Sequence, residues 1–175
     1  MDDDLLLDLA IALDGSLYAA VQIGLLRSDD SGKTWRGCLE AEGVPVTAVA
    51  VAEDGTVLAA VPGGIGRSAD RGETWTFVQL PEPAPMIASL ACSGGTLIAG
   101  TMQDGVFLST DGGETWSARN AGLLDHDVRA VAATSDALHA ATSTGLFASA
   151  NGGLRWRPIG NLPDMAPLAA LRALP

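Results

Sequence analysis

Short apolar segments, separated by glycine and polar residues, run through the whole chain. Segments 46–51 (Val-Thr-Ala-Val-Ala-Val) and 128–133 (Val-Arg-Ala-Val-Ala-Ala) have the alternating character of strands. Segments 17–20 and 57–60 are continuously apolar and follow closely after a glycine. No segment shows the apolar spacing near 3.6 residues that an amphipathic helix requires. The pattern therefore predicts an all-β fold of many short strands.

The tryptophans reveal an internal repeat of about 40 residues. They stand at Trp35, Trp75, Trp116 and Trp156, so the steps between them are 40, 41 and 40 residues. Each repeat holds four predicted strands, and the Trp is expected to open the last of them. A period of about 40 residues with four strands is typical of one β-propeller blade. We predict a single domain over 1–175 with antiparallel blades at about 5–38, 46–80, 86–119 and 128–160, and an extra strand of the first type at 166–174.

A Ser-x-Asp-x-Gly-x-Thr-Trp phrase surrounds each Trp and predicts a hairpin turn. Ser and Asp side chains can replace the backbone hydrogen bonds that a turn loses, and Gly can take a positive φ. Because the Asp recurs in every good copy, a structural role is favoured over a catalytic one. The four copies are Ser28, Asp30, Gly32, Thr34 and Trp35; Ser68, Asp70, Gly72, Thr74 and Trp75; Ser109, Asp111, Gly113, Thr115 and Trp116; and Ser149, Asn151, Gly153 and Trp156, the last having lost its Asp and Thr.

These phrases resemble the Asp-box, or bacterial neuraminidase repeat. It occurs in sialidases, sortilin-type receptor domains, xyloglucan-cleaving glycosidases and a photosystem II assembly factor. The resemblance implies a propeller whose boxes lie between the third and fourth strands, away from the usual binding face. It does not choose between enzyme and binding protein. A sialidase would also need a nucleophilic Tyr, whereas the only tyrosine, Tyr18, stands where other repeats have Leu58, Ile98 and His139, which predicts a core position.

The densest polar group in the sequence is Asp125-His126-Asp127, close to Arg129. It lies in a predicted connection between blades, while Asp104 lies in a predicted turn between second and third strands. Such loops form the binding face of a propeller, so these five residues are the candidate ligand-binding residues. They could bind a cation, act in acid–base chemistry or simply be a solvated acidic loop. A glycosidase would need two such carboxylates at about 5 to 9.5 Å from each other.

Charge and cysteine content narrow the classes of partner. Ten basic against 21 acidic residues give a formal charge of −11, which disfavours nucleic acid. No apolar run approaches the length needed to span a bilayer, and no basic secretory signal opens the chain, so no membrane association and a cytoplasmic location are expected. Cys38 and Cys92 fall at non-equivalent repeat positions, which predicts two free thiols, no metal site and no cofactor.

Four blades are fewer than Asp-box propellers usually have. The sequence leaves open a truncated array, a homo-oligomer in which two copies complete an eight-blade ring, and a closed four-blade ring, with the first two favoured because open arrays expose apolar faces. We expect a non-catalytic scaffold that binds a protein or carbohydrate ligand. The alternatives are a divergent sialidase-like or xyloglucanase-like glycoside hydrolase, or a fragment of one, and a purely structural half-propeller.

Overall fold

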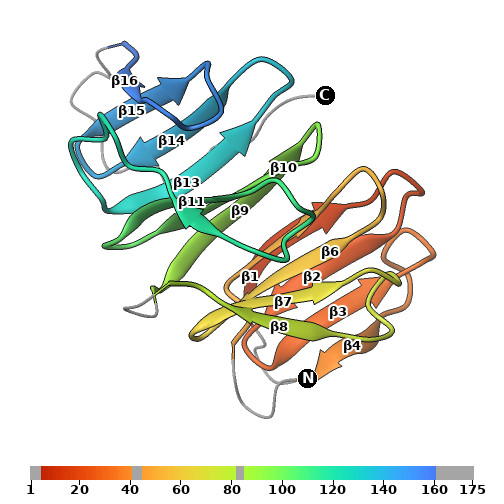
Figure 1. The fold of residues 1–175 in the computed structure, drawn as a ribbon. Helices are drawn as coiled ribbons and strands as arrows, with labels where there is room; N and C mark the ends of the chain where they lie inside the picture. Colours follow the sequence, from red (N-terminus) through yellow and green to blue (C-terminus); the bar gives the residue numbers. More distant parts are fainter. Residues whose placement is uncertain (1–4, 41–44, 82–84, 161–175) are drawn as a thin grey trace.

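A computed structural model describes residues 5–40, 45–81 and 85–160. In these residues every regular element is a β-strand, which confirms the all-β prediction. Figure 1 shows the strands as four successive sheets, which we call blades 1 to 4. Their bounds are β1 Leu6–Ile11, β2 Leu17–Val21, β3 Gly24–Ser28 and β4 Arg36–Glu40; β5 Ala48–Val51, β6 Val57–Val61, β7 Gly64–Ser68 and β8 Thr76–Gln79; β9 Ile87–Ser93, β10 Thr96–Thr101, β11 Gly105–Ser109 and β12 Ser117–Ala118; and β13 Val128–Ala133, β14 Leu138–Thr142, β15 Gly145–Ser149 and β16 Arg157–Pro158.

Each blade is a four-stranded antiparallel meander in chain order, from β1-β2-β3-β4 to β13-β14-β15-β16. This is the blade of a β-propeller, as the sequence predicted. The last strand starts one residue after the Trp in every blade, so the Trp immediately precedes this strand rather than opening it. The predicted strand 166–174 lies outside the described residues.

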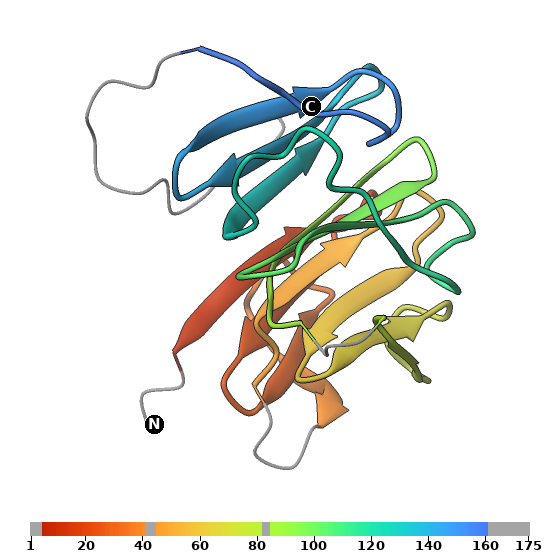
Figure 2. The same cartoon turned by 60° about the vertical axis from the view of Figure 1, so that its left-hand side comes forward.

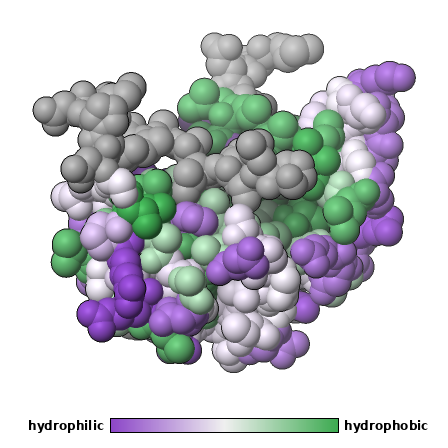
Figure 3. Space-filling view, turned by 90° about the horizontal axis from the view of Figure 1, so that it is seen from above, coloured by the Kyte–Doolittle hydropathy of each residue, from purple (hydrophilic) through white to green (hydrophobic). Residues whose placement is uncertain are grey.

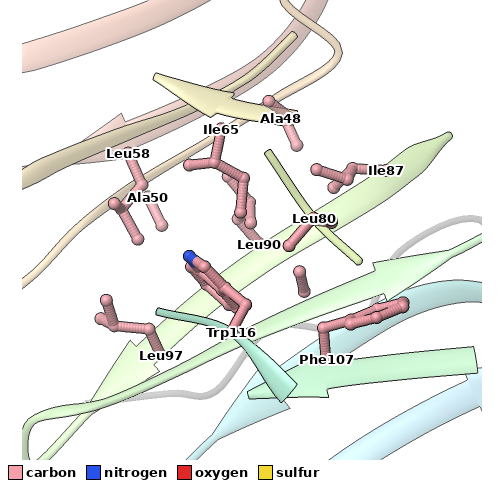
Figure 4. Packing of buried hydrophobic residues seen from close by; sticks show 12 residues of the cluster. Ala48, Ala50, Leu58, Ile65, Leu80, Ile87, Leu90, Leu97, Phe107 and Trp116 are labelled. Atoms are coloured by element: carbon pink, nitrogen blue, oxygen red, sulfur yellow. The ribbon is translucent and has the colours of Figure 1, made fainter. Parts of the chain in front are cut away.

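The core lies between blades rather than within one sheet. Each of three clusters of buried apolar residues joins two consecutive blades, and none joins blade 4 to blade 1 in the described part of the chain. Between blades 2 and 3, Trp116 packs among Leu58, Leu90 and Leu97 (Figure 4). The blades stack as successive layers from the red end of the chain to the blue end (Figure 2). The structure is thus an open array of propeller blades.

The exposure of the four tryptophans follows their place in the array. Trp116 and Trp156 are 7% and 1% exposed, and Trp75 is half-buried, because each packs against the blade before it. Trp35 is 41% exposed, and no described blade precedes it. The same turn therefore buries its Trp only where a neighbouring blade covers it. No helix capable of crossing a membrane occurs in the described residues.

This difference predicts unequal costs for truncating two equivalent tryptophans. Trp156→Ala removes a fully buried ring from the interface between blades 3 and 4, and should lower the free energy of unfolding by about 3–5 kcal/mol. Trp35→Ala, in dilute solution, should lower it by clearly less, because 41% of Trp35 is already exposed. Urea denaturation followed by circular dichroism measures both. Equal effects would contradict this account of the core.

Candidate functional site

The two ends of the blades carry different kinds of residues. Turns between first and second and between third and fourth strands lie at one end, which we call the turn face. Turns between second and third strands and the connections between blades lie at the other end, which we call the loop face. The Ser-x-Asp-x-Gly phrases follow β3, β7, β11 and β15 and so belong to the turn face. All five candidate ligand-binding residues lie at the loop-face end, Asp104 after β10 and 125–129 around the start of β13.

The structure brings the Asp104 turn beside the 125–127 connection. The Gly105 N–H donates to the His126 carbonyl at 3.0 Å, and the Asn120 amide donates to the Asp104 carbonyl at 2.8 Å. Asn120 also accepts from the Val106 N–H at 2.7 Å, which fixes the turn. Residues that are more than 20 apart in the sequence therefore form one hydrogen-bonded patch on the loop face.

Arg129 is exposed to solvent and paired with Asp127. Its guanidinium donates to both carboxylate oxygens of Asp127, at 2.7 Å each, in a bidentate pair. Arg129 sits in a β-bulge between Val128 and Ala130, where the β13–β14 register shifts. Because the carboxylate is occupied by the guanidinium, Asp127 is poorly placed to act as a nucleophile or acid.

Asp125 is also occupied by its own surroundings. Ser143 Oγ donates to one carboxylate oxygen at 2.5 Å and the Asp127 N–H donates to the other at 2.9 Å. Burial acts to raise the pKa of Asp125, but these hydrogen bonds outweigh it and leave the pKa below its ordinary value. A general acid needs a raised pKa instead. His126 is exposed, and Asp104 is half-buried with its backbone in the turn network.

A cavity of about 510 Å³ lies along the first strands of all four blades, β1, β5, β9 and β13. It runs the length of these strands, because Leu6 and Ile11 at the two ends of β1 both line it, and so do Arg129 and Ala133 of β13. We call it the central hollow. Its lining is mainly aliphatic, and Arg129 lies at its loop-face end. Seen from above, hydrophobic surface gathers around a hollow on one side of the molecule, bordered by hydrophilic residues (Figure 3).

The first strand of each blade lines the central hollow, and we call these four the inner strands. Polar side chains on them link consecutive blades, and the sequence interpretation missed these links. Asp8 of blade 1 accepts from the Val49 N–H of blade 2 at 3.0 Å, and Ser89 of blade 3 accepts from the Val131 N–H of blade 4 at 3.2 Å. By sheet register, Asp8 and Ser89 are equivalent, and the residue at this place in blade 2 is Ala48. Ala48 has no side-chain acceptor, and blades 2 and 3 are linked instead by the Thr47 hydroxyl, which donates to the Ile87 carbonyl at 2.9 Å. The polar residue near the middle of the first strand in blades 1 and 3 could have indicated these links from the sequence.

The four turns between third and fourth strands are built on one hydrogen-bond pattern. In blade 3, Ser109 Oγ donates to Asp111 at 2.7 Å and accepts from the Gly113 N–H at 2.9 Å, while Asp111 accepts from the Thr115 N–H at 2.9 Å and from its hydroxyl at 2.5 Å. Blades 1 and 2 repeat all four bonds. Gly113 has a φ of +90°, and a Cβ there would crowd Leu58 and Leu97.

Blade 4 keeps this turn with altered residues. Asn151 accepts from Ser149 at 2.8 Å and from the Arg155 N–H at 3.0 Å. Arg155 has no hydroxyl, so the fourth bond of the pattern is lost. The turn therefore tolerates Asn in place of Asp without losing its backbone geometry.

Two arginines tie the turns to the preceding blade. Arg27 of blade 1 donates to the Arg71 carbonyl in the turn of blade 2 at 2.8 Å, and Arg67 of blade 2 donates to the Gly112 carbonyl in the turn of blade 3 at 2.6 Å. Tyr18 donates to the same Arg71 carbonyl at 3.1 Å and is buried, so its predicted core position is confirmed. Both arginines stand immediately before the Ser of the repeated phrase, and this recurrence could have identified them from the sequence.

Both cysteines are free and half-buried. Desolvation raises the pKa of each thiol to about 11, so neither is a thiolate at neutral pH. In the described parts of the chain no three His, Cys, Asp or Glu side chains converge as a metal site would require.

Comparison with known proteins agrees with the class that the blades define, a β-propeller protein. Residues 5–163 match a protein family described as HVO_0234-like, beta propeller, and the chain belongs to this family. A comparison with curated proteins found no match.

Three solved structures illustrate the fold that the chain shares. The extracellular domain of the putative one component system BT4673 from B. thetaiotaomicron has 15% identity and a TM-score of 0.71 over 93% of this chain and 22% of its own. The structure of YCF48 bound to D1 peptide has 17% identity and a TM-score of 0.66, and the match covers 89% of this chain and 55% of that one. An ancestral GH74 enzyme has 22% identity and a TM-score of 0.71, and the match covers 92% of this chain and 25% of that one. The chain thus spans between about a fifth and just over half of these proteins.

The turn aspartates predict an acid-sensitive fold. Hydrogen bonds from Thr74 and Ser68 lower the pKa of Asp70 to about 2, and those from Thr115 and Ser109 lower the pKa of Asp111 further. Because the folded pKa lies below the unfolded value, the stabilisation is complete above about pH 4 and is lost as pH falls towards 2. The double variant Asp70→Asn, Asp111→Asn should therefore lose less stability between pH 5 and pH 2 than the parent protein.

Thermal unfolding followed by circular dichroism at several pH values in this range measures the difference. The matched control is Asp136→Asn, which changes an exposed carboxylate outside the phrases. If the double variant and the control lose stability in parallel with the parent, the turn carboxylates do not cause the acid sensitivity.

Proposed function

We propose that the protein is a non-catalytic Asp-box propeller module that binds an extended polypeptide segment in the central hollow. The observation that carries this proposal is the hollow itself. Its volume of about 510 Å³ falls within the range of about 300–1,000 Å³ that ligand sites commonly take. Most of its lining residues are aliphatic, and its polar side chains include Asp8, Thr47, Ser89 and Arg129.

The geometry of the turns supports the Asp-box assignment. A side-chain pattern that repeats in three blades and persists with Asn151 in the fourth serves the same local purpose each time. These carboxylates lie on the turn face, so they are remote from the loop-face patch. The repeated aspartates are therefore structural, and ligand recognition falls to residues that differ between blades.

The inner strands favour a polypeptide over other ligands. In every blade the first strand is an edge strand that pairs with one strand only, and the Val49 and Val131 N–H groups on these edges donate to Asp8 and Ser89. Edge strands bind extended peptides by adding a strand, with affinity from backbone hydrogen bonds and specificity from side-chain pockets. The neighbouring structure of YCF48 bound to D1 peptide provides a precedent in a related fold. The chain's charge of −11 favours a segment that combines apolar with basic residues.

A glycoside hydrolase receives less support from the same patch. The GH74 enzyme shares the fold at 22% identity, which carries no chemistry to this chain. Asp127 is paired with Arg129, and the pKa of Asp125 is lowered rather than raised. Neither carboxyl group is therefore prepared to protonate a glycosidic oxygen.

Binding to a peptide array tests the proposal. Extended peptides that alternate apolar and basic residues should bind, and Leu7→Glu should weaken this binding at least about tenfold, because Leu7 lines the hollow and a carboxylate there cannot be desolvated cheaply. The control is Leu154→Glu, which alters an exposed leucine of the turn face. Fluorescence polarisation of labelled peptides gives the affinities.

Two results would overturn the proposal. Equal loss of binding in both variants would place the contact outside the hollow, or show that binding is non-specific. Hydrolysis of a glycoside panel that Asp125→Asn abolishes would favour the enzyme instead.

A further inference from the structure

The chain builds one type of blade junction three times. At two of these junctions the Trp indole donates to a backbone carbonyl of the preceding blade: Trp75 to Cys38 and Trp156 to Arg119, both at 2.6 Å. Cys38 and Arg119 each stand three residues after the Trp of their own blade. Each junction thus has a Trp half, from the later blade, and an acceptor half, from the earlier blade.

Blade 1 has a Trp half that no described blade covers. Trp35 is 41% exposed, and its indole bonds only to the Gly32 carbonyl of its own turn among the described residues, at 3.1 Å. Leu17 of β2 is half-buried, whereas its counterparts Val57 and Leu97 are 0% and 1% exposed. The blade 1 surface therefore has the side chains of a junction without the burial.

Blade 4 has the complementary acceptor half. His139 and Leu146 are half-buried, although their counterparts in blade 1, Tyr18 and Leu25, are 1% and 0% exposed. Ile159 stands three residues after Trp156, the place of Cys38 and Arg119, and is also half-buried. Its N–H donates to the Leu146 carbonyl at 2.9 Å, as Arg119 does to Val106, so its backbone has the junction geometry.

The polar contacts of the two halves also match. Inside the chain, Tyr18 donates to the Arg71 carbonyl in the next blade's turn. His139 occupies the Tyr18 position on blade 4 and has a ring N–H to donate. Ser31 occupies the Arg71 position in the turn of blade 1. Both members of this contact are present, one at each end of the array.

We propose that a second copy of the chain fills these faces, with blade 4 of each copy packed on blade 1 of the other. In each junction the Trp35 indole donates to the Ile159 carbonyl of the other copy, and His139 donates to the Ser31 carbonyl. The contact is head-to-tail, and because it occurs twice around a two-fold axis it closes into a ring of eight blades. The same side chains that seal the internal junctions thus seal the junctions between copies.

Solution mass by light scattering and sedimentation, over a hundredfold range of concentration, tests this. The wild-type protein should reach twice its 17.8 kDa. Trp35→Ala and Leu146→Glu should each weaken dimerisation at least about tenfold, the size expected for an anchor residue of an interface. Phe77→Ala is the control, because Phe77 is 62% exposed on the outer strand β8 and lies on neither free face. Circular dichroism shows whether each variant is folded.

Mixing the two variants separates this arrangement from other dimers. A Trp35→Ala copy keeps an intact blade 4 and a Leu146→Glu copy keeps an intact blade 1, so the mixture retains one complete junction and should associate more strongly than either variant alone. A wild-type monomer at all concentrations, assemblies larger than two copies, or a dimer insensitive to Trp35→Ala would each overturn the proposal.

Discussion

The structure depends on one constraint: a small sheet with apolar residues on both faces has to be covered on both faces. No single blade of about 40 residues can do this alone, so the core forms between sheets and each blade relies on its neighbours. The Trp at the end of each turn is the largest side chain in this packing. Its exposure, from 41% in blade 1 to 1% in blade 4, records how completely the preceding blade covers the face that carries the Trp.

The same constraint separates the residues that hold the blades together from those that are free to vary between blades. Contacts that recur with the repeat, such as Ser109 with Asp111 or Arg27 with the Arg71 carbonyl, hold turns in shape and fasten them to the next blade. The loop face is free of this requirement, and its residues differ from blade to blade. The patch around Asp125, at the connection between blades 3 and 4, is one part of the chain that does not follow the repeat.

Sequence reasoning succeeded where information is local and repeated. The spacing of the tryptophans and the Ser-x-Asp-x-Gly phrase define the blades, because both depend on a few adjacent residues. It could not find contacts whose partners come from different blades. The bond from the Val49 N–H to Asp8 joins residues 41 apart in two blades and depends on how the sheets stack. The bond from Ser143 to Asp125 joins two loops at one end of blade 4 and turns a predicted site carboxylate into a structural acceptor. The repeated phrase alone encodes neither pairing.

An array of repeats is nearly one-dimensional, so its two ends necessarily present the two halves of the interface that its interior uses. Natural repeat proteins cover these two exposed faces in two ways: their end units have polar outer faces, or the array closes into a ring. In blade 1 the outward side chains are Leu17 and Trp35, and in blade 4 they include Leu146, so neither end has a polar cap in the described residues. The proposed pairing of two copies would cover both ends in the second of these ways. Trp35 and Trp156 occupy equivalent positions, and Trp35 is exposed because no described blade covers it.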